Sequence, residues 1–230
     1  MSQTAAQDTC FSSRQTLLCP AGRILDLGQP QVMGILNLTP DSFFAGSRVA
    51  NQTDHSDLLR RAEAMLTAGA AVLDLGAYSS RPGAEDISAE EEQRRLLPAL
   101  AAVREAFPQA FLSVDTFRAG IAAQAVAAGA DLINDISGGT LDTDMFATVG
   151  RLRVPYVLMH MRGTPQTMTR QTDYTDDIVL ELVRYFRDKL VALRALGVVD
   201  VVLDPGFGFA KTPAQSHELL RRLGELRLLG

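Results

Sequence analysis

Six short apolar segments, many of them rich in β-branched residues, recur along the chain. Each is followed by polar turn residues, and most are then followed by a helical pattern. Because the segments are apolar on both faces, they predict parallel strands that are covered by helices. Two architectures alternate strands and helices in this way, a doubly wound open sheet and a (β/α)8 barrel. The six segments are 32–36, 71–75, 110–114, 131–133, 155–159 and 198–203.

The segments between the strands predict an amphipathic helix at 54–68, an alanine-rich helix at 118–128 and a long helix at about 176–196, each stopped by a glycine directly after it. Ser88 and Glu91 have the spacing of a capping box and open a further helix. A basic amphipathic helix is expected at 219–230, leading into a seventh strand. Ahead of the first strand, residues around 20–22 predict a small β-hairpin that plugs the N-terminal end of a barrel.

The arrangement of polar residues favours the barrel over the doubly wound sheet. No GxGxxG motif follows the first strand, and polar residues close nearly every strand instead of gathering at one switch point. A closed barrel needs eight strands, whereas only six are predicted. We therefore expect an α/β (β/α)8 TIM barrel that is incomplete here, with an extended or disordered N-terminus at 1–15 and one domain at 16–230 that lacks its last strands. Either a partner completes the barrel or the sequence is truncated at its C-terminus.

The composition narrows the classes of partner. The 230 residues carry a net charge of −5, so the overall field would repel nucleic acid and anionic membrane surfaces. We find no secretory leader and no apolar run of the roughly 18 residues that a membrane span requires. Cys10 and Cys19 lack any CxxC spacing and are read as free thiols. These features predict a cytoplasmic protein with no nucleic-acid or membrane partner.

Polar side chains close the predicted strands, and in a barrel these ends meet at one rim, where active sites are built. Any one of them has an ordinary alternative as a strand-end cap or turn residue. Together they form a hydrogen-bonding surface that suits a flat heterocycle rich in hydrogen-bond donors, since a carboxylate accepts two hydrogen bonds from a guanidine-like edge. The residues are Asn37, Asp74, Asp115, Asn134, Asp135, His160 and Asp204.

Six segments in a fixed order give the sequence a specific resemblance to a known family. They are MGILNLTPDSFF, LDLGAYSSRPGAE, SVDTF, DLINDISGG, VLMHMRGTP and LDPGFGFAKT. In this order, and across nearly the whole chain, they resemble the dihydropteroate synthases of folate biosynthesis. The resemblance implies a pterin-binding TIM barrel. It also implies a transferase that joins 4-aminobenzoate to 6-hydroxymethyl-7,8-dihydropterin diphosphate and releases diphosphate.

The resemblance also implies roles for individual residues. Asn37 matches the residue that helps to hold Mg²⁺ on the diphosphate, which makes Mg²⁺ the expected cofactor. The residues matching the pterin contacts are Asp115, Asn134, Asp204 and Met159. The residues matching the loops that bind diphosphate and 4-aminobenzoate are Asp41, Phe43, Ser80, Arg81, Pro82 and Phe209. The sequence departs from the common pattern at Tyr78, where many members have Glu, and at Ala210, where Gly is frequent.

Several points stay open. The family also uses a lysine of the seventh strand and an Arg-x-His motif of the eighth, which are absent here, so we expect this 230-residue chain to have little or no activity. The alternatives are a non-catalytic pterin-binding remnant and a folate-dependent methyltransferase-type barrel. The full-length protein could form a homodimer. His160 is favoured as a structural residue over a general base, and Lys211 has no assigned role.

Overall fold

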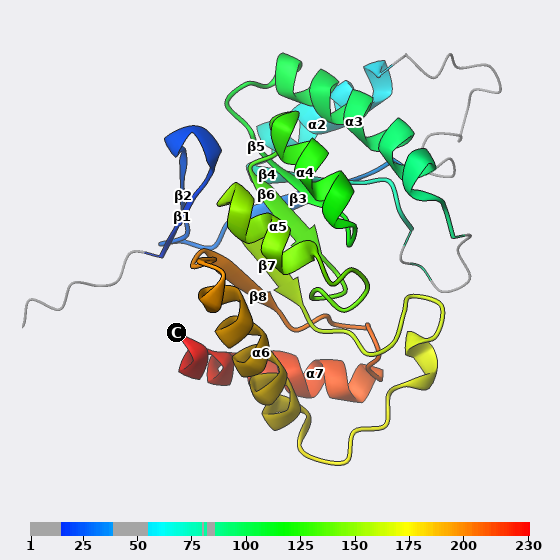
Figure 1. The fold of residues 1–230 in the computed structure, drawn as a ribbon, viewed down its shortest axis with the longest axis vertical. Coiled ribbons are helices and arrows are strands. Elements are labelled where there is room, and N and C mark those ends of the chain that lie inside the picture. Colours follow the sequence, from blue (N-terminus) through cyan, green and yellow to red (C-terminus); the bar gives the residue numbers. More distant parts are fainter. Residues whose placement is uncertain (1–14, 39–54, 80, 82–85) are drawn as a thin grey trace, which may run out of the picture.

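A computed structural model describes residues 15–38, 55–79, 81 and 86–230. Its centre is a parallel sheet of six strands in the order β3-β4-β5-β6-β7-β8, flanked by helices (Figure 1). All six predicted strands are confirmed. They are β3 (Val32–Asn37), β4 (Ala70–Gly76), β5 (Phe111–Asp115), β6 (Leu132–Asp135), β7 (Tyr156–Met159) and β8 (Val201–Asp204).

The strand order follows the chain order without a switch point, as in a barrel and unlike a doubly wound sheet. In the part of the chain that the structure describes, β3 and β8 form the two edges of the sheet and the barrel is not closed. Val32 and Ile35 of β3 are therefore 62% and 58% exposed. This agrees with the expectation of an incomplete barrel.

Helices connect the strands and cover one side of the sheet (Figure 1). They are α2 (Ser56–Thr67), α3 (Ala89–Ala106), α4 (Ala119–Ala127), α5 (Met145–Leu152), α6 (Ile178–Ala195) and α7 (Pro213–Arg221). The expected cap of α3 is confirmed, since the Ser88 hydroxyl accepts a hydrogen bond from the Glu91 amide at 3.2 Å. The glycines after α2, α4 and α6 adopt positive φ, with Gly197 at +80°, which ends these helices as predicted.

The prediction of one helix over residues 219–230 was wrong. The helix α7 begins earlier, at a capping box in which the Thr212 hydroxyl accepts from the Gln215 amide, and it ends at Arg221. A 3-10 helix (Leu223–Leu229) follows and contains Gly224, a poor residue for an α-helix interior. The short helix α5 was not predicted; it has no side-chain cap at Asp144, and the residue after its end is Arg153 and not a glycine.

The predicted N-terminal hairpin is confirmed. Strands β1 (Thr16–Leu18) and β2 (Ile24–Asp26) pair antiparallel around a 3-10 turn (Pro20–Gly22). Leu17 and Leu25 of the hairpin are buried in a cluster with residues of the sheet. No helix in the described ranges is both long enough and apolar enough to cross a membrane.

Candidate functional site

The register of the sheet places the four predicted pterin residues on one face, near the carboxyl ends of the strands. Asp115 lies opposite Asn134, and Asn134 lies opposite Val157. Met159 follows Val157 by two residues and lies opposite Asp204. Since residues two apart in a strand share a face, as do register partners, all four side chains belong to the same side of the sheet. This is the convergence that the barrel prediction required.

Asp74 was predicted at a strand end, and this placement was wrong. It lies two residues before the end of β4, opposite Ser113, so it sits one layer deeper in the same face. Its Oδ2 accepts a hydrogen bond from Nδ2 of Asn134 at 3.0 Å. This contact fixes the orientation of the Asn134 amide, with Oδ1 left as a free acceptor.

Three buried polar atoms of this face have no hydrogen-bond partner among the described residues. They are Asp74 Oδ1, Ser113 Oγ and Asn134 Oδ1. Buried polar atoms in native proteins are nearly always paired, so a cluster of unpaired ones indicates a place that a ligand or ordered water completes. The three atoms come from neighbouring strands and lie beside the predicted pterin residues.

Burial dominates the electrostatics of this face. It raises the pKa of Asp74, although the Ser113 hydroxyl and the Asn134 amide oppose the rise. The pKa of Asp115 is raised well above its usual range, first by burial and then by the negative charges of Asp74, Asp135 and Glu92. A ligand that donates N–H groups would replace the lost solvation of these carboxyl groups.

Asp135 was also predicted at the rim, but its side chain serves a different purpose. It accepts hydrogen bonds from the amides of Ser137 at 2.7 Å and Gly139 at 2.9 Å and from the Tyr156 hydroxyl at 2.6 Å. As the neighbour of Asn134 in β6, it points to the opposite face of the sheet. Asp135 therefore shapes the turn after β6 and does not line the candidate site.

The loop after β8 carries two predicted site residues. Asp204 accepts a hydrogen bond from the Gly206 amide at 2.8 Å, which holds its carboxylate at the start of the loop. Phe209 is half-buried and packs on an apolar cluster that includes Met159 and Met161. The aromatic ring and the carboxylate thus lie on one short segment beside Met159.

Lys211 and His160 form a buried contact at the base of this loop. The Nζ atom of Lys211 lies 2.9 Å from Nδ1 of His160, and both side chains are almost fully buried. Burial lowers the pKa of Lys211 to about 7 and that of His160 to about 3. A neutral imidazole that is tied to a lysine fits the structural role favoured for His160. The sequence signal for Lys211 was its place directly after a glycine-rich strand-end loop.

The loop after β4 is only partly described. Asp41, Phe43, Ser80 and Pro82 lie outside the described residues, and Arg81 is exposed. The contacts of Tyr78 show how this loop begins. The Tyr78 hydroxyl accepts from Nε2 of Gln166 at 2.8 Å, and its ring meets that of Phe117 edge-on with centroids 4.9 Å apart.

Asn37 lies at the end of β3, opposite Gly76, and is half-buried. No group of three or more His, Cys, Asp or Glu residues that could hold a metal occurs in the described ranges. Mg²⁺ usually takes only one or two oxygens from the protein and the rest from phosphates and water. A single amide oxygen at Asn37 fits a metal that is shared with a phosphorylated ligand, and does not fit a cage made by protein alone.

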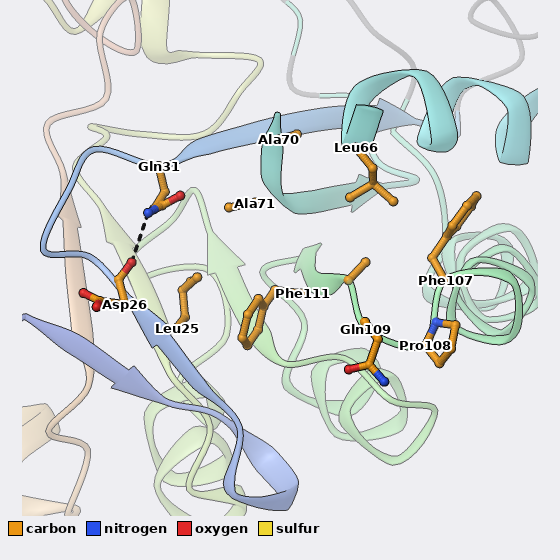
Figure 2. A pocket seen from close by; sticks show the side chains of 11 residues that line it. Leu25, Asp26, Gln31, Leu66, Ala70, Ala71, Phe107, Pro108, Gln109 and Phe111 are labelled. Atoms are coloured by element: carbon orange, nitrogen blue, oxygen red, sulfur yellow. Dashed lines mark hydrogen bonds between the residues drawn. The ribbon is translucent and has the colours of Figure 1, made fainter. Parts of the chain in front are cut away.

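A hollow of about 570 Å³ lies away from these residues. It is lined mainly by apolar side chains, including Leu25, Leu66, Phe107 and Phe111, with a hydrogen bond between Gln31 and the Asp26 carbonyl at its margin (Figure 2). It lies at the N-terminal ends of β4 and β5, the end of a barrel that serves stability and not catalysis. We therefore do not assign it to the candidate site.

Comparison with known proteins agrees with this geometry. Residues 33–230 match the family described as "Pterin binding enzyme". The chain is 43% identical over 215 residues to dihydropteroate synthase of Synechocystis, covering 92% of this chain and 73% of the relative. It is 44% identical over 198 residues to the folic acid synthesis protein fol1 of Pneumocystis carinii, of which it spans only 26%.

Solved structures give the same result. Dihydropteroate synthase of Xanthomonas albilineans with 4-aminobenzoic acid superposes with a TM-score of 0.83 at 38% identity, over 95% of this chain and 76% of that chain. The Thermus thermophilus enzyme in complex with 6HMPPP superposes with a TM-score of 0.74 at 38% identity, over 94% and 74% of the two chains. The family match, the sequence identity and the shared fold show that this chain belongs to the pterin-binding enzymes and, among them, to the dihydropteroate synthases.

Proposed function

We propose that the protein condenses 6-hydroxymethyl-7,8-dihydropterin diphosphate with 4-aminobenzoate to give 7,8-dihydropteroate and diphosphate. The observation that carries the proposal is the shared face of Asp115, Asn134 and Asp204, with unpaired polar atoms buried beneath it. The relatives solved with 4-aminobenzoic acid and with 6HMPPP support the same pair of substrates.

The pterin would bind on this face through its polar edge. The Asp204 carboxylate would accept hydrogen bonds from the amino edge of the ring. Asn134 would accept one more through Oδ1, because its Nδ2 is already donated to Asp74. Met159 would supply an apolar contact to the flat of the ring.

The reaction breaks the C–O bond between the pterin methylene and the diphosphate, and it forms a C–N bond to the arylamine. The electron-rich ring stabilises positive charge at the methylene carbon, so the diphosphate can leave before the amine attacks. The amine nitrogen then releases a proton, which needs no strong protein base. Positioning of the two substrates and stabilisation of the departing charge are the protein's contributions.

Asn37 is the residue that would hold Mg²⁺, through one amide oxygen at the end of β3. When bound, the metal would neutralise charge on the leaving diphosphate. Arg81 is exposed at the loop after β4 and could meet the same charge. Ser80, Pro82, Asp41 and Phe43 would be further contacts from the loops, and Phe209 would form a wall of the 4-aminobenzoate site.

The cytoplasmic location, the homodimer and the division into 1–15 and 16–230 remain predictions.

Calorimetry with dihydropterin diphosphate, with and without Mg²⁺, tests the proposal on the 230-residue chain. We expect binding that strengthens with Mg²⁺, and binding weakened roughly 100-fold by Asp204→Asn, because a buried site made for hydrogen bonds loses its charged acceptor. The matched control is Asp188→Asn, an exposed change on α6. Binding that ignores both Mg²⁺ and Asp204 would overturn the synthase assignment. Metal-independent binding that still needs Asp204 would favour a pterin-binding remnant or a methyltransferase-type site.

A further inference from the structure

We propose that Lys211 is a positioning residue that fastens the loop after β8 to the end of β7 and so sets the places of Asp204 and Phe209. The inference rests on the proposed function, because it concerns two residues of the same site. It gives a role to the lysine that the sequence left unassigned.

The contacts of Lys211 bring the two segments together. Its Nζ donates hydrogen bonds to the carbonyl of His160 at 3.2 Å, directly after β7, and to the carbonyls of Gly206 at 3.1 Å and Phe209 at 3.0 Å in the loop. It also lies 2.9 Å from Nδ1 of His160. One amine thus joins a strand end to both halves of a loop, and no other side chain of the described loop makes so many links across it.

The loop needs these hydrogen bonds because its backbone is closely packed and partly strained. A Cβ added at Gly206 would lie 2.3 Å from the His160 carbonyl oxygen, so the loop runs directly against the end of β7. Ala210 adopts a φ of +52°, which costs a residue with a Cβ about 1 kcal/mol. A conformation of this kind persists only where its surroundings hold it in place.

The imidazole of His160 lies against the amine, with Nδ1 2.9 Å from Nζ. Its ring packs edge-on against Tyr185 with centroids 4.8 Å apart, and the Tyr185 hydroxyl donates to the Met159 carbonyl at 3.2 Å. The imidazole therefore cannot turn away from Lys211 without disturbing β7. Removing the amine would take away the donor to the carbonyls of His160 and Phe209, and the loop would open to hydrate them.

The composition makes a direct experiment possible, because Lys189 and Lys211 are the only lysines in the sequence. With ¹⁵N-labelled lysine, we expect the side-chain signal of Lys211 to exchange slowly with water and that of Lys189 to exchange fast. Lys189→Met assigns the two signals. On addition of the pterin ligand, the Lys211 signal should shift, which a lysine that only supports the fold would not show.

Hydrogen exchange and binding then test the consequence. Lys211→Met should speed amide exchange in residues 204–212 at least tenfold and weaken binding of both the dihydropterin diphosphate and 4-aminobenzoate by about tenfold, the loss expected for one hydrogen-bonded contact. Lys189→Met, a half-buried lysine of α6 near Phe146, should change neither. If Lys211→Met fails to fold, His160→Phe removes only the contact between Nδ1 and Nζ and should give the same effects at smaller size.

The outcomes separate this inference from the proposed function. Faster exchange in the loop with unchanged ligand binding would overturn the positioning role, as would unchanged exchange in the loop. If the wild-type chain binds no pterin ligand, the proposed function fails. In that case, the Lys211 signal would still exchange slowly in the wild-type chain and fast in His160→Phe. This result would show that the lysine holds the loop in place.

Discussion

The two ends of the sheet bury charge in opposite ways. At the N-terminal end, Asp131 is 3% exposed and its carboxylate is fully occupied. It accepts from Arg23 at 2.8 Å, from Arg104 at 2.6 Å and from the Leu112 amide at 2.8 Å. The chain itself supplies every partner, and the hairpin that carries Arg23 is thereby joined to the start of the strands.

At the C-terminal end, Asp74 is buried and Asp115 is half-buried near it, and neither carboxyl group has an ion pair among the described residues. Polar atoms of Asp74, Ser113 and Asn134 are left unpaired. At the N-terminal end, every buried polar side chain of the described residues is paired within the chain, and this end serves stability. At the C-terminal end, buried polar groups are left unpaired, which lowers stability and creates a binding site. Substitutions at the two ends should therefore change stability in different directions.

The largest effect on stability is expected at the N-terminal end of the sheet, where Asp131 is fully paired. Asp131→Ala would leave two arginines without their shared buried partner and should lower the free energy of unfolding by about 3 kcal/mol. Guanidinium unfolding measures this change. The control Asp188→Ala removes an exposed pair with Arg187 and should have no measurable effect. A loss below about 1 kcal/mol at Asp131 would contradict the assignment of this end to stability.

The second effect is a pH dependence at the site end. The pKa of Lys211 is lowered from 10.5 to about 7, chiefly by burial; the charge of Asp204 opposes the shift and that of Arg162 adds to it. Between these values the unfolded chain binds the proton and the folded chain does not, so stability rises with pH, by up to about 2 kcal/mol from pH 7 to pH 9. His160, the remaining group facing Nζ, titrates far below this range. Lys211→Met should show a smaller rise in urea unfolding at the two pH values, and an equal rise would exclude Lys211 as its source.

At Asp115, a substitution is expected to raise stability, by less than the loss expected at Asp131. Because its pKa is raised in the folded state, its folded form holds a proton that the unfolded form loses, and stability falls as the pH rises above about 4. Asp115→Asn should remove this fall and raise stability at pH 7 by about 1 kcal/mol, while it weakens pterin binding. Urea unfolding at pH 5 and pH 7 and calorimetry check both parts. A destabilised variant with unchanged binding would show that Asp115 belongs to the fold and not to the site.

The smallest effect is expected at Ser113. Its buried hydroxyl lies close enough to Asp74 to oppose the rise in that pKa but makes no well-formed hydrogen bond among the described residues, so Ser113→Ala should change stability by less than about 0.5 kcal/mol. The matched control is Thr116→Val, which removes a buried hydroxyl that donates to Glu92 at 2.6 Å and should cost about 1–3 kcal/mol. Thermal unfolding of both variants makes the comparison. Equal losses would mean that Ser113 is bonded after all.

Much of the fold could be predicted because its signals are local. Apolar runs, helix caps and glycine stops lie within a few residues of the structure they specify, which is why six strands and the hairpin were found. The short helix α5 was missed because it has neither a side-chain cap nor a glycine at its end, and the break after Arg221 was missed although Gly224 follows closely. The site residues could be named from motifs, but Asp74 was placed at the rim and Asp135 in the site.

The sequence by itself determined the alternation of strands and helices, the barrel-like architecture and the identity of the polar residues at the strand ends. Only the tertiary structure decided how deep Asp74 lies, how the Asn134 amide is turned, which way Asp135 faces and what Lys211 holds. The physical reason is that these properties depend on strand register and on contacts between distant segments. A shift of one residue in a strand sends a side chain to the other face, and Lys211 meets His160 across 51 positions of the chain.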